Sequence, residues 1–239
     1  MNFISTKEEL LNAVNIVQKA VSNKTTMPIL EGILFKVIDA TIFLMGTDLE
    51  IGIKTELPGK IIRPGSVVIS AKLLAELVRK LPDDDVILEL KENFILNIKC
   101  LNSEFNIQGQ SDDDFPELPQ VHSDREISID KELFKSMIKE TIFSVAKSEN
   151  IPILTGELIE IKEGIIKFVA LDGYRLALRQ GKINEDVTLS EVVPERTLSE
   201  LYRISSISHV DSVQISYTKN QILFRLDQTH IVSLSLIHI

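Results

Sequence analysis

The sequence is short of several residue types, and each shortage narrows what the chain can be. Its single cysteine, Cys100, excludes an internal disulfide and a zinc site built from cysteines. Tryptophan is absent and aromatic residues make up 5% of the 239 residues, so isoleucine, leucine and valine must supply the core. Because branched aliphatic residues are enriched in strands, this composition favours a sheet-rich fold. Cys100 lies in an alternating apolar stretch, which predicts a buried thiol.

Long apolar runs and a basic excess are also missing. No window approaches the 18 or so apolar residues of a membrane-spanning helix, and residues 1–9 lack the pattern of a signal peptide. We therefore expect a cytoplasmic protein that does not enter a membrane. The net charge of −9 is opposite in sign to an open surface that grips DNA by releasing counterions. Any nucleic-acid role must use locally segregated cations, or must hold DNA by topology.

The clearest positive feature is an internal repeat. The segment Pro28–Gly32 (PILEG) recurs as Pro152–Gly156 (PILTG), a shift of 124 from Pro28 to Pro152. The same shift relates further residues in order: Asp48 to Asp172, Lys72 to Arg196, and Glu76-Leu77 to Glu200-Leu201. A period this long is typical of a duplicated domain rather than a solenoid repeat.

Each copy contains the same predicted elements in the same order. Apolar residues at helical spacing predict a first helix in each copy: Leu10, Leu11, Val14, Val17 and Val21, then Phe134, Met137, Ile138 and Val145. Strands are expected at 33–37, 42–45, 158–161 and 165–170, second helices at 72–81 and 196–204, and closing hairpins at 86–100 and 212–226. The apolar sides of the second helices are expected to face the sheet: Leu73, Leu74, Leu77 and Leu81 in the first copy, and Leu198, Leu201 and Ile204 in the second. This order predicts an α+β fold of tandem repeated domains, each with two helices packed on antiparallel sheet.

The stretch Asp112–Pro119 separates the two copies. It is acidic and contains two prolines, which favours an extended linker over the surface. We expect the domain boundary near residue 122, with a first domain at 1–121 and a second at 122–239. A magnesium site on Asp112–Asp114 and Glu117, as in a metal-dependent hydrolase, is the alternative interpretation, but contiguous acids beside prolines are far more typical of a solvated linker.

Four segments resemble a known family: Met27–Leu30 (MPIL), Gly46–Glu50 (GTDLE), Asp113–Pro116 (DDFP) and Leu171–Ala177 (LDGYRLA). Each is similar to a segment of the bacterial DNA polymerase III beta subunit, the beta sliding clamp, and they occur in the family's order across nearly the whole chain. The resemblance implies the DNA clamp fold and a non-catalytic processivity subunit without metal or cofactor. The family has three such domains in each subunit. We therefore expect this chain to hold the first two, with an aberrant tail at 234–239 and with ring closure in doubt.

The resemblance also implies which cations face the DNA. In the family the second helices line the pore, and the residues that match are Lys72, Arg79, Arg196 and Arg203. Three lysines of the second copy's first helix recur every four residues and join this set: Lys131, Lys135 and Lys139. Lys24 lies in a loop that the family uses for DNA contact. Without the resemblance, ordinary solvated helix faces are the favoured explanation of these cations.

A partner-peptide pocket is the second implied site. Its matching residues are Leu154, Leu171, Gly173, Tyr174, Arg175 and Leu176, where Leu171 and Tyr174 replace the family's usual Thr and His. The implied partners are double-stranded DNA without sequence preference, the DNA polymerase III catalytic subunit, the clamp loader, other proteins with a clamp-binding motif, and a second subunit in a homodimeric ring. The alternative is a clamp-fold scaffold that binds partner peptides without encircling DNA. Asp48 and Asp172, repeated in both copies, are predicted to cap a turn rather than to act in catalysis.

Overall fold

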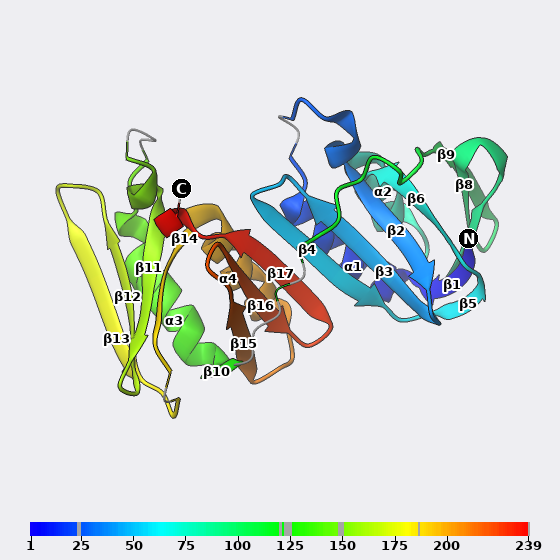
Figure 1. Cartoon of the computed structure of the whole chain (residues 1–239). Helices are drawn as coiled ribbons and strands as arrows, with labels where there is room; N and C mark the ends of the chain where they lie inside the picture. The colour runs from blue at the N-terminus through cyan, green and yellow to red at the C-terminus, as the bar shows by residue number, and fades with distance from the viewer. Residues whose placement is uncertain (23–24, 120, 122–125, 148–150, 186, 239) are drawn as a thin grey trace. The chain divides into compact units, whose positions relative to one another are not determined.

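The computed structural model describes residues 1–22, 25–119, 121, 126–147, 151–185 and 187–238. The chain divides into two compact units, Met1–Leu118 (unit 1) and Pro119–Ile239 (unit 2). In Figure 1 unit 1 runs from blue to green and unit 2 from green to red. The boundary between the units lies three residues before the one expected from the sequence.

Unit 1 contains two antiparallel sheets and two helices. One sheet has the order β5-β1-β7-β8-β9, from β1 (Asn2–Thr6), β5 (Lys60–Arg63), β7 (Asp85–Leu90), β8 (Ile95–Cys100) and β9 (Ser103–Gln108). The other has the order β4-β3-β2-β6, from β2 (Gly32–Ile38), β3 (Thr41–Thr47), β4 (Ile51–Leu57) and β6 (Gly65–Ser70). Helices α1 (Lys7–Val17) and α2 (Ala71–Lys80) pack against each other. Short 3-10 helices follow α1 and precede β2 and β8: η1 (Gln18–Ala20), η2 (Pro28–Glu31) and η3 (Glu92–Phe94).

Unit 2 repeats this arrangement. Its sheets have the orders β10-β15-β16-β17 and β13-β12-β11-β14. The strands are β10 (Ile127–Asp130), β11 (Gly156–Lys162), β12 (Ile165–Leu171), β13 (Leu176–Lys182), β14 (Leu189–Pro194), β15 (Ser212–Tyr217), β16 (Gln221–Leu226) and β17 (Thr229–Leu234). The helices are α3 (Lys131–Thr141) and α4 (Glu195–Ile207), with 3-10 helices η4 (Ile142–Ser144), η5 (Pro152–Thr155) and η6 (Leu236–His238). No helix among the described residues is long and apolar enough to cross a membrane.

The equivalent elements of the two units keep the shift of 124 found in the sequence. It relates α1 to α3, β2 to β11, β3 to β12 and β6 to β14 residue by residue. Helix α4 has 13 residues where α2 has 10, and the strands that follow it are displaced accordingly. The predicted α+β fold, with two helices and antiparallel sheet in each copy, is confirmed.

The first helix of each unit begins at a polar cap in the equivalent position. In α1 the Thr6 hydroxyl accepts from the Glu9 amide at 3.2 Å, and the Glu9 carboxylate accepts from the Thr6 amide at 3.4 Å. In α3 the Asp130 carboxylate accepts from the Leu133 amide at 2.8 Å. These bonds satisfy amides that have no partner within the helix, so the sequence itself fixes where both helices start.

Aromatic rings occupy different places in the two cores. In unit 1, Phe3 stacks on Phe35 with ring centroids 6.1 Å apart. In unit 2, Phe134 lies between Phe168 and Phe224, with centroids at 5.6 and 5.9 Å. All five rings are fully buried. Each core therefore combines a small group of aromatic rings with the aliphatic side chains that the composition predicted.

The acidic segment after β9 is held more firmly than a surface linker. Phe115 is buried in a cluster with Ile29, Leu30, Leu34 and Val68. The Asp112 carboxylate accepts a hydrogen bond from the Ser66 hydroxyl at 2.7 Å. The expectation of an extended linker over the surface is therefore wrong for residues 112–115, because Phe115 covers an apolar area that β2 and β6 leave open.

Two residues that could bind a metal, Asp113 and Cys100, have a local contact and a buried position respectively. Within the described ranges, no three His, Cys, Asp or Glu side chains are grouped so as to hold an ion. The Asp113 carboxylate accepts from the neighbouring Ser111 hydroxyl at 2.7 Å. Cys100 is buried on β8, as predicted, and burial raises the pKa of its thiol. Asp113 is therefore part of a local turn contact, and Cys100 is part of the core.

Candidate functional sites

Helix α2 presents two cations on its exposed side. Lys72 and Arg79 are both exposed, and neither forms an ion pair with another residue that the structure describes. Glu76 lies between them on the same side, at a spacing of four and three residues. The buried side of the helix consists of small and aliphatic residues: Ala71, Leu74, Ala75 and Val78. Local amphipathicity therefore fixes the orientation of this cationic side.

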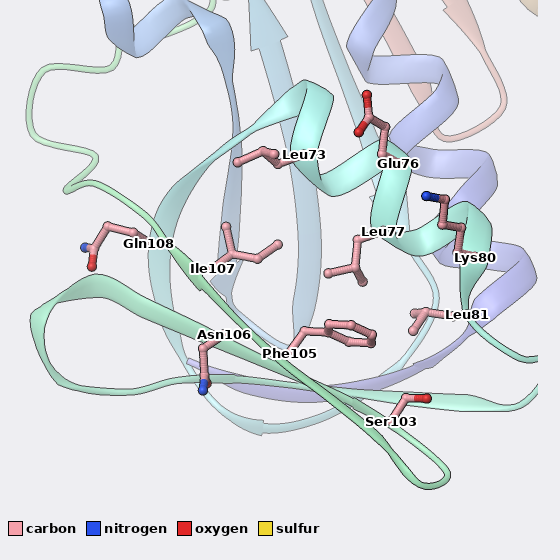
Figure 2. A pocket seen from close by; sticks show the side chains of 10 residues that line it. All are labelled: Leu73, Glu76, Leu77, Lys80, Leu81, Ser103, Phe105, Asn106, Ile107 and Gln108. Atoms are coloured by element: carbon pink, nitrogen blue, oxygen red, sulfur yellow. The ribbon is translucent and has the colours of Figure 1, made fainter.

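Leu73 and Leu77 depart from the expectation that they face the sheet. Leu73 is 54% exposed, and both leucines line a cavity of about 440 Å³ between α2 and β9. Figure 2 shows Leu73, Leu77 and Phe105 around this space, with Phe105 coming from β9. The prediction was wrong because Ala71 and Ala75 take the inward positions, which turns the larger leucines toward β9. Since β9 is the last strand of its sheet, the cavity lies at a free sheet edge.

Helix α4 carries the equivalent cations of unit 2. Arg196 and Arg203 are both exposed, as their counterparts on α2 are. Arg203 Nη1 lies 2.6 Å from Glu200 Oε1, and the arginine side chain keeps 64% of its area exposed. The Glu200 side chain is 12% exposed, so the glutamate is held at the helix surface while the guanidinium of Arg203 remains open to solvent.

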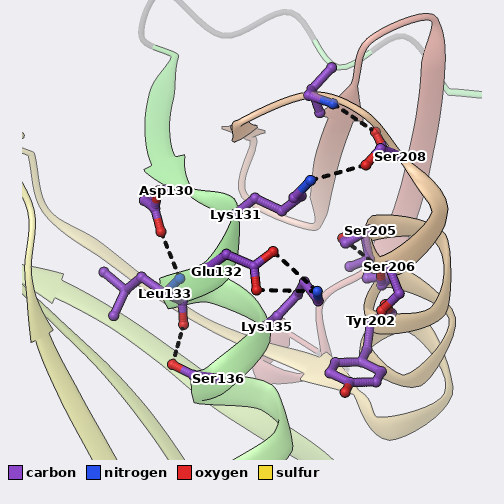
Figure 3. Close-up of polar contacts among 12 residues, drawn as sticks. Asp130, Lys131, Glu132, Leu133, Lys135, Ser136, Tyr202, Ser205, Ser206 and Ser208 are labelled. Carbon is purple, nitrogen blue, oxygen red and sulfur yellow. Dashed lines mark hydrogen bonds and ion pairs between the residues drawn. The ribbon is translucent and has the colours of Figure 1, made fainter.

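The three lysines of α3 have different surroundings. Lys131 is half-buried, and its Nζ donates to the Ser208 carbonyl at 3.0 Å, at the C-terminal end of α4 (Figure 3). Lys135 Nζ lies 3.2 Å from Glu132 Oε1, whereas Lys139 is exposed. A cation at the end of a helix stabilises its unpaired carbonyls, which gives Lys131 a structural role in unit 2. The expected DNA contact Lys24 lies outside the described residues.

The turn between β12 and β13 is built around Asp172. One of its carboxylate oxygens accepts from the amides of Tyr174 at 3.0 Å and Arg175 at 3.1 Å. These two bonds, with that from the Arg175 side chain, lower the pKa of Asp172. Gly173 takes a φ of +90°, a conformation that glycine adopts without steric strain. Asp48 holds the equivalent turn of unit 1 through Glu50 and Ile51 amides, so the predicted capping role is confirmed for both aspartates.

Four side chains near this turn form an exposed, largely apolar surface, which we call the Arg175 surface: Phe143, Tyr174, Arg175 and Leu176. Arg175 Nε lies 2.9 Å from Asp172 Oδ2, and its guanidinium lies over the Phe143 ring, 5.8 Å from the centroid. Tyr174 is wholly exposed and Leu176 is 62% exposed. The aspartate thus holds the arginine against an aromatic ring while large apolar side chains remain open to solvent, an arrangement suited to a peptide.

The remaining expected pocket residues flank this surface, and one contributor was missed. Leu154 and Leu171 are both half-buried, and the Leu154 carbonyl accepts from the Ala146 amide at 2.9 Å. Phe143, on η4, was not among the expected residues. Its signal was present in the repeat, because Phe143 is an exposed aromatic residue where the first copy has Lys19.

The α+β unit is duplicated and carries cations at matching places on its second helices. This arrangement places the chain in the class of DNA clamp folds. Residues 1–119 match the family model described as DNA polymerase III beta subunit, N-terminal domain, and residues 128–238 match that of its central domain. The chain belongs to the DNA polymerase III beta subunit family.

Relatives and solved structures agree with this assignment. The chain is 35% identical to the beta sliding clamp of Bacillus subtilis over 235 residues, which cover 94% of this chain and 62% of that protein. The crystal structure of the Bacillus subtilis DNA polymerase sliding clamp superposes with a TM-score of 0.94 at 34% identity, covering 99% of this chain and 64% of that one. The DNA polymerase III beta subunit of Thermotoga maritima gives a TM-score of 0.92 at 26% identity, covering 98% and 64%. The chain thus spans less than two thirds of the length of these relatives.

Proposed function

We propose that the chain supplies two domains of a DNA sliding clamp, which encircles duplex DNA without reading its sequence and tethers DNA polymerase III during replication. The observation that carries this proposal is the repeated cation pattern: exposed Lys72 and Arg79 on α2, and exposed Arg196 and Arg203 at the equivalent places on α4. Cations that touch phosphates position a protein on DNA but carry no sequence information. With a net charge of −9, such a protein retains DNA by topology and slides over small barriers.

The cavity at the edge of unit 1 fits the assembly that a ring requires. A free strand edge can add the strand of another domain, and an apolar groove beside it can bury that domain's side chains. Leu73, Leu77 and Phe105 supply the apolar surface at β9. We assign this edge to contact with a clamp domain of a second subunit in a homodimeric ring.

The Arg175 surface is assigned to partner peptides. Large apolar side chains beside a fixed guanidinium can bury an apolar peptide residue and bind a carbonyl or carboxylate next to it. The proposed partners are the DNA polymerase III catalytic subunit, the clamp loader and other proteins that carry a clamp-binding motif. In this function the chain performs no catalysis and needs no cofactor.

The DNA role is tested with short duplexes of two unrelated sequences, labelled and titrated by fluorescence anisotropy at low salt. We expect equal, weak binding to both duplexes, and a loss of about tenfold in the double variant Lys72→Glu/Arg79→Glu. The matched control is Lys162→Glu/Lys182→Glu, which changes two exposed lysines on strands of unit 2 by the same charge. Equal effects of the two double variants would contradict a specific role for α2 and would favour a scaffold that binds only peptides. Retention by topology is tested with plasmid DNA. The protein should stay bound longer to the circular plasmid than to the same plasmid made linear.

The peptide role is tested with a short peptide from the polymerase catalytic subunit, by isothermal titration. Phe143→Ala and Leu176→Ala should each weaken binding by about tenfold or more, because each removes an apolar contact. Ile165→Ala, an exposed residue at the far end of β12, is the control. Binding that is equal in all three variants would contradict the assignment.

A further inference from the structure

Glu157 is a buried acid that the proposed function does not use. It lies near the start of β11, on the same inward side as Ile159 and Ile161, and its side chain is fully buried. Neither carboxylate oxygen has a hydrogen-bond partner in the part of the chain that the structure describes. An isolated carboxylate in such a place is strongly disfavoured over the neutral acid. The equivalent residue of unit 1 is Ile33, which is also fully buried.

Two further buried residues, at the end of α3 and in η4, are polar in unit 2 and apolar in unit 1. Thr141 and Ser144 stand where unit 1 has Val17 and Ala20, and all four are buried. The Thr141 hydroxyl lies beside Glu157 and donates its proton to the Met137 carbonyl at 2.6 Å. The single proton of this hydroxyl can be donated either to the Met137 carbonyl or to an ionised Glu157, so the two oxygens compete for it.

Among the residues that the structure describes, no charge of opposite sign is buried next to Glu157 to hold it ionised. From β14 the acid Glu191 faces the same core, and its carboxylate accepts from the Ser235 hydroxyl. The other charged residues on β11, β12, α3 and α4 are exposed or half-exposed: Glu160, Lys162, Lys167, Lys131, Glu132, Lys135, Lys139, Glu140, Glu195, Arg196, Glu200 and Arg203. Burial, opposed by a smaller effect of the Thr141 hydroxyl, raises the pKa of Glu157 to about 7.

Thr141 connects Glu157 to the Arg175 surface. It ends α3 two residues before Phe143, and Ser144 follows Phe143 at the end of η4. Beyond η4 the Val145 amide donates to the Ile142 carbonyl, and the Ala146 amide donates to the Leu154 carbonyl. A charge placed at Glu157 draws water or the Thr141 proton toward itself, and either change disturbs the end of α3 and the η4 turn.

We propose that Glu157 is a proton-responsive positioning residue: with its proton it keeps η4 and Phe143 packed, and when the proton passes to solvent η4 loosens. The structural part of this proposal concerns unit 2 alone. Its consequence, weaker binding of a partner peptide at higher pH, rests on the proposed function of the Arg175 surface.

The test is amide hydrogen exchange of Val145 and Ala146 in the full chain, near pH 6 and near pH 8.5, corrected for the intrinsic exchange rates. In the unchanged protein, protection of these amides should fall by about tenfold between the two conditions, because Glu157 ionises between them. In Glu157→Gln, which mimics the protonated acid, protection should be the same at both. Glu160→Gln removes an exposed carboxylate from the same strand and should behave as the unchanged protein does.

Equal protection at both pH values in the unchanged protein would overturn the proposal, as would a Glu157 carboxyl whose ¹³C signal titrates below about pH 5. If Glu157→Gln fails to fold, Glu157→Ile carries the residue of unit 1 and serves the same purpose. Peptide titrations at the two pH values separate the two proposals. Suppose that amide protection depends on pH but the peptide binds at neither pH. This result supports the proton response of Glu157 and contradicts only the assignment of the Arg175 surface to peptides.

Discussion

Units 1 and 2 fill the same fold with different large side chains. In unit 2 the rings of Phe134, Phe168 and Phe224 occupy the places that Leu10, Leu44 and Ile98 occupy in unit 1. In unit 1 the rings of Phe3 and Phe35 occupy the places of Ile127 and Ile159. Each unit therefore has aromatic rings at core positions where the other unit has aliphatic side chains. The comparison teaches that the fold requires total core volume and apolar pattern, and does not require a given residue at a given place.

The two units also differ in polarity at one inward position. Ile33 in unit 1 has an apolar environment that includes Val17, whereas Glu157 in unit 2 lies beside Thr141. Burying a neutral carboxylic acid next to a hydroxyl costs far less free energy than burying a charged carboxylate among hydrocarbon side chains. The exposed residue Phe143, against Lys19 in unit 1, lies on the turn that follows Thr141. The candidate peptide surface thus lies beside positions at which the two copies differ in chemistry.

The largest expected effect comes from the aromatic cluster of unit 2. Phe134→Ala removes the ring between Phe168 and Phe224 and should destabilise the chain by about 3–5 kcal/mol. Leu10→Ala, at the equivalent place in unit 1, should cost about 2–5 kcal/mol, at or below the value for Phe134. Urea unfolding followed by circular dichroism measures both. A smaller loss for Phe134→Ala than for Leu10→Ala would show that the ring cluster can collapse around the missing side chain.

Glu157 should make the stability of unit 2 depend on pH, and the sign follows from its raised pKa. Between the usual value of 4.5 and about 7 the folded state keeps a proton that the unfolded state has released. The contribution of Glu157 to the free energy of unfolding is therefore fully present below pH 4.5 and falls as the pH rises from there toward 7. Above pH 7 the total loss is about 3 kcal/mol.

Melting temperatures of the unchanged protein and Glu157→Gln, measured between pH 5 and pH 9, test this dependence. The variant should lose the part of the slope that Glu157 contributes and should be the more stable of the two above pH 7. The reverse substitution in unit 1, Ile33→Glu, should introduce a similar slope. Parallel curves for the unchanged protein and Glu157→Gln would exclude Glu157 as the titrating group.

A smaller effect is expected at Gly46, whose counterpart in unit 2 is Ala170. A Cβ at Gly46 would lie 2.9 Å from the Val17 carbonyl oxygen, a backbone atom that cannot easily move. Gly46→Ala should therefore destabilise unit 1 by about 1–3 kcal/mol, whereas Ala170→Gly should cost about 1 kcal/mol or less in unit 2. Denaturant midpoints measure the two costs. If Gly46→Ala is neutral, α1 must be able to move away from β3.

The smallest effect is expected at the helix caps. Thr6→Ala removes the hydroxyl that accepts from the Glu9 amide but keeps the Thr6 amide that donates to the Glu9 carboxylate, and Asp130→Ala removes the bond to the Leu133 amide. Each should cost about 1 kcal/mol, and Asp130→Ala should be the larger because it also removes a negative charge from the start of a helix. The comparison needs matched urea titrations. A larger cost for Thr6→Ala would indicate that the hydroxyl cap of α1 matters more than the charge at the start of α3.

The repeat allowed much of the fold to be predicted from the sequence. Helical and strand periodicity located α1–α4 and several strands to within a few residues, and the turns at Asp48 and Asp172 were correctly assigned. Leu73 and Leu77 were misplaced because alanines count weakly in a hydrophobic pattern yet pack inward on α2. Phe115 was missed because an apolar residue among acids and prolines gives no periodic signal. Phe143 was missed because its role depends on Arg175, which is 32 residues away in the chain.

By itself, the sequence determined the duplicated α+β fold, the caps that start α1 and α3 and the exposed cations of α2 and α4, since these follow from local chemistry and from periodicity. Only the tertiary structure decided that Arg175 lies over Phe143, that Leu73, Leu77 and Phe105 line one cavity between α2 and β9, and that Glu157 is buried beside the Thr141 hydroxyl. Those features depend on distances between segments far apart in the chain. Such distances are set by how volumes pack together, and no local pattern encodes them.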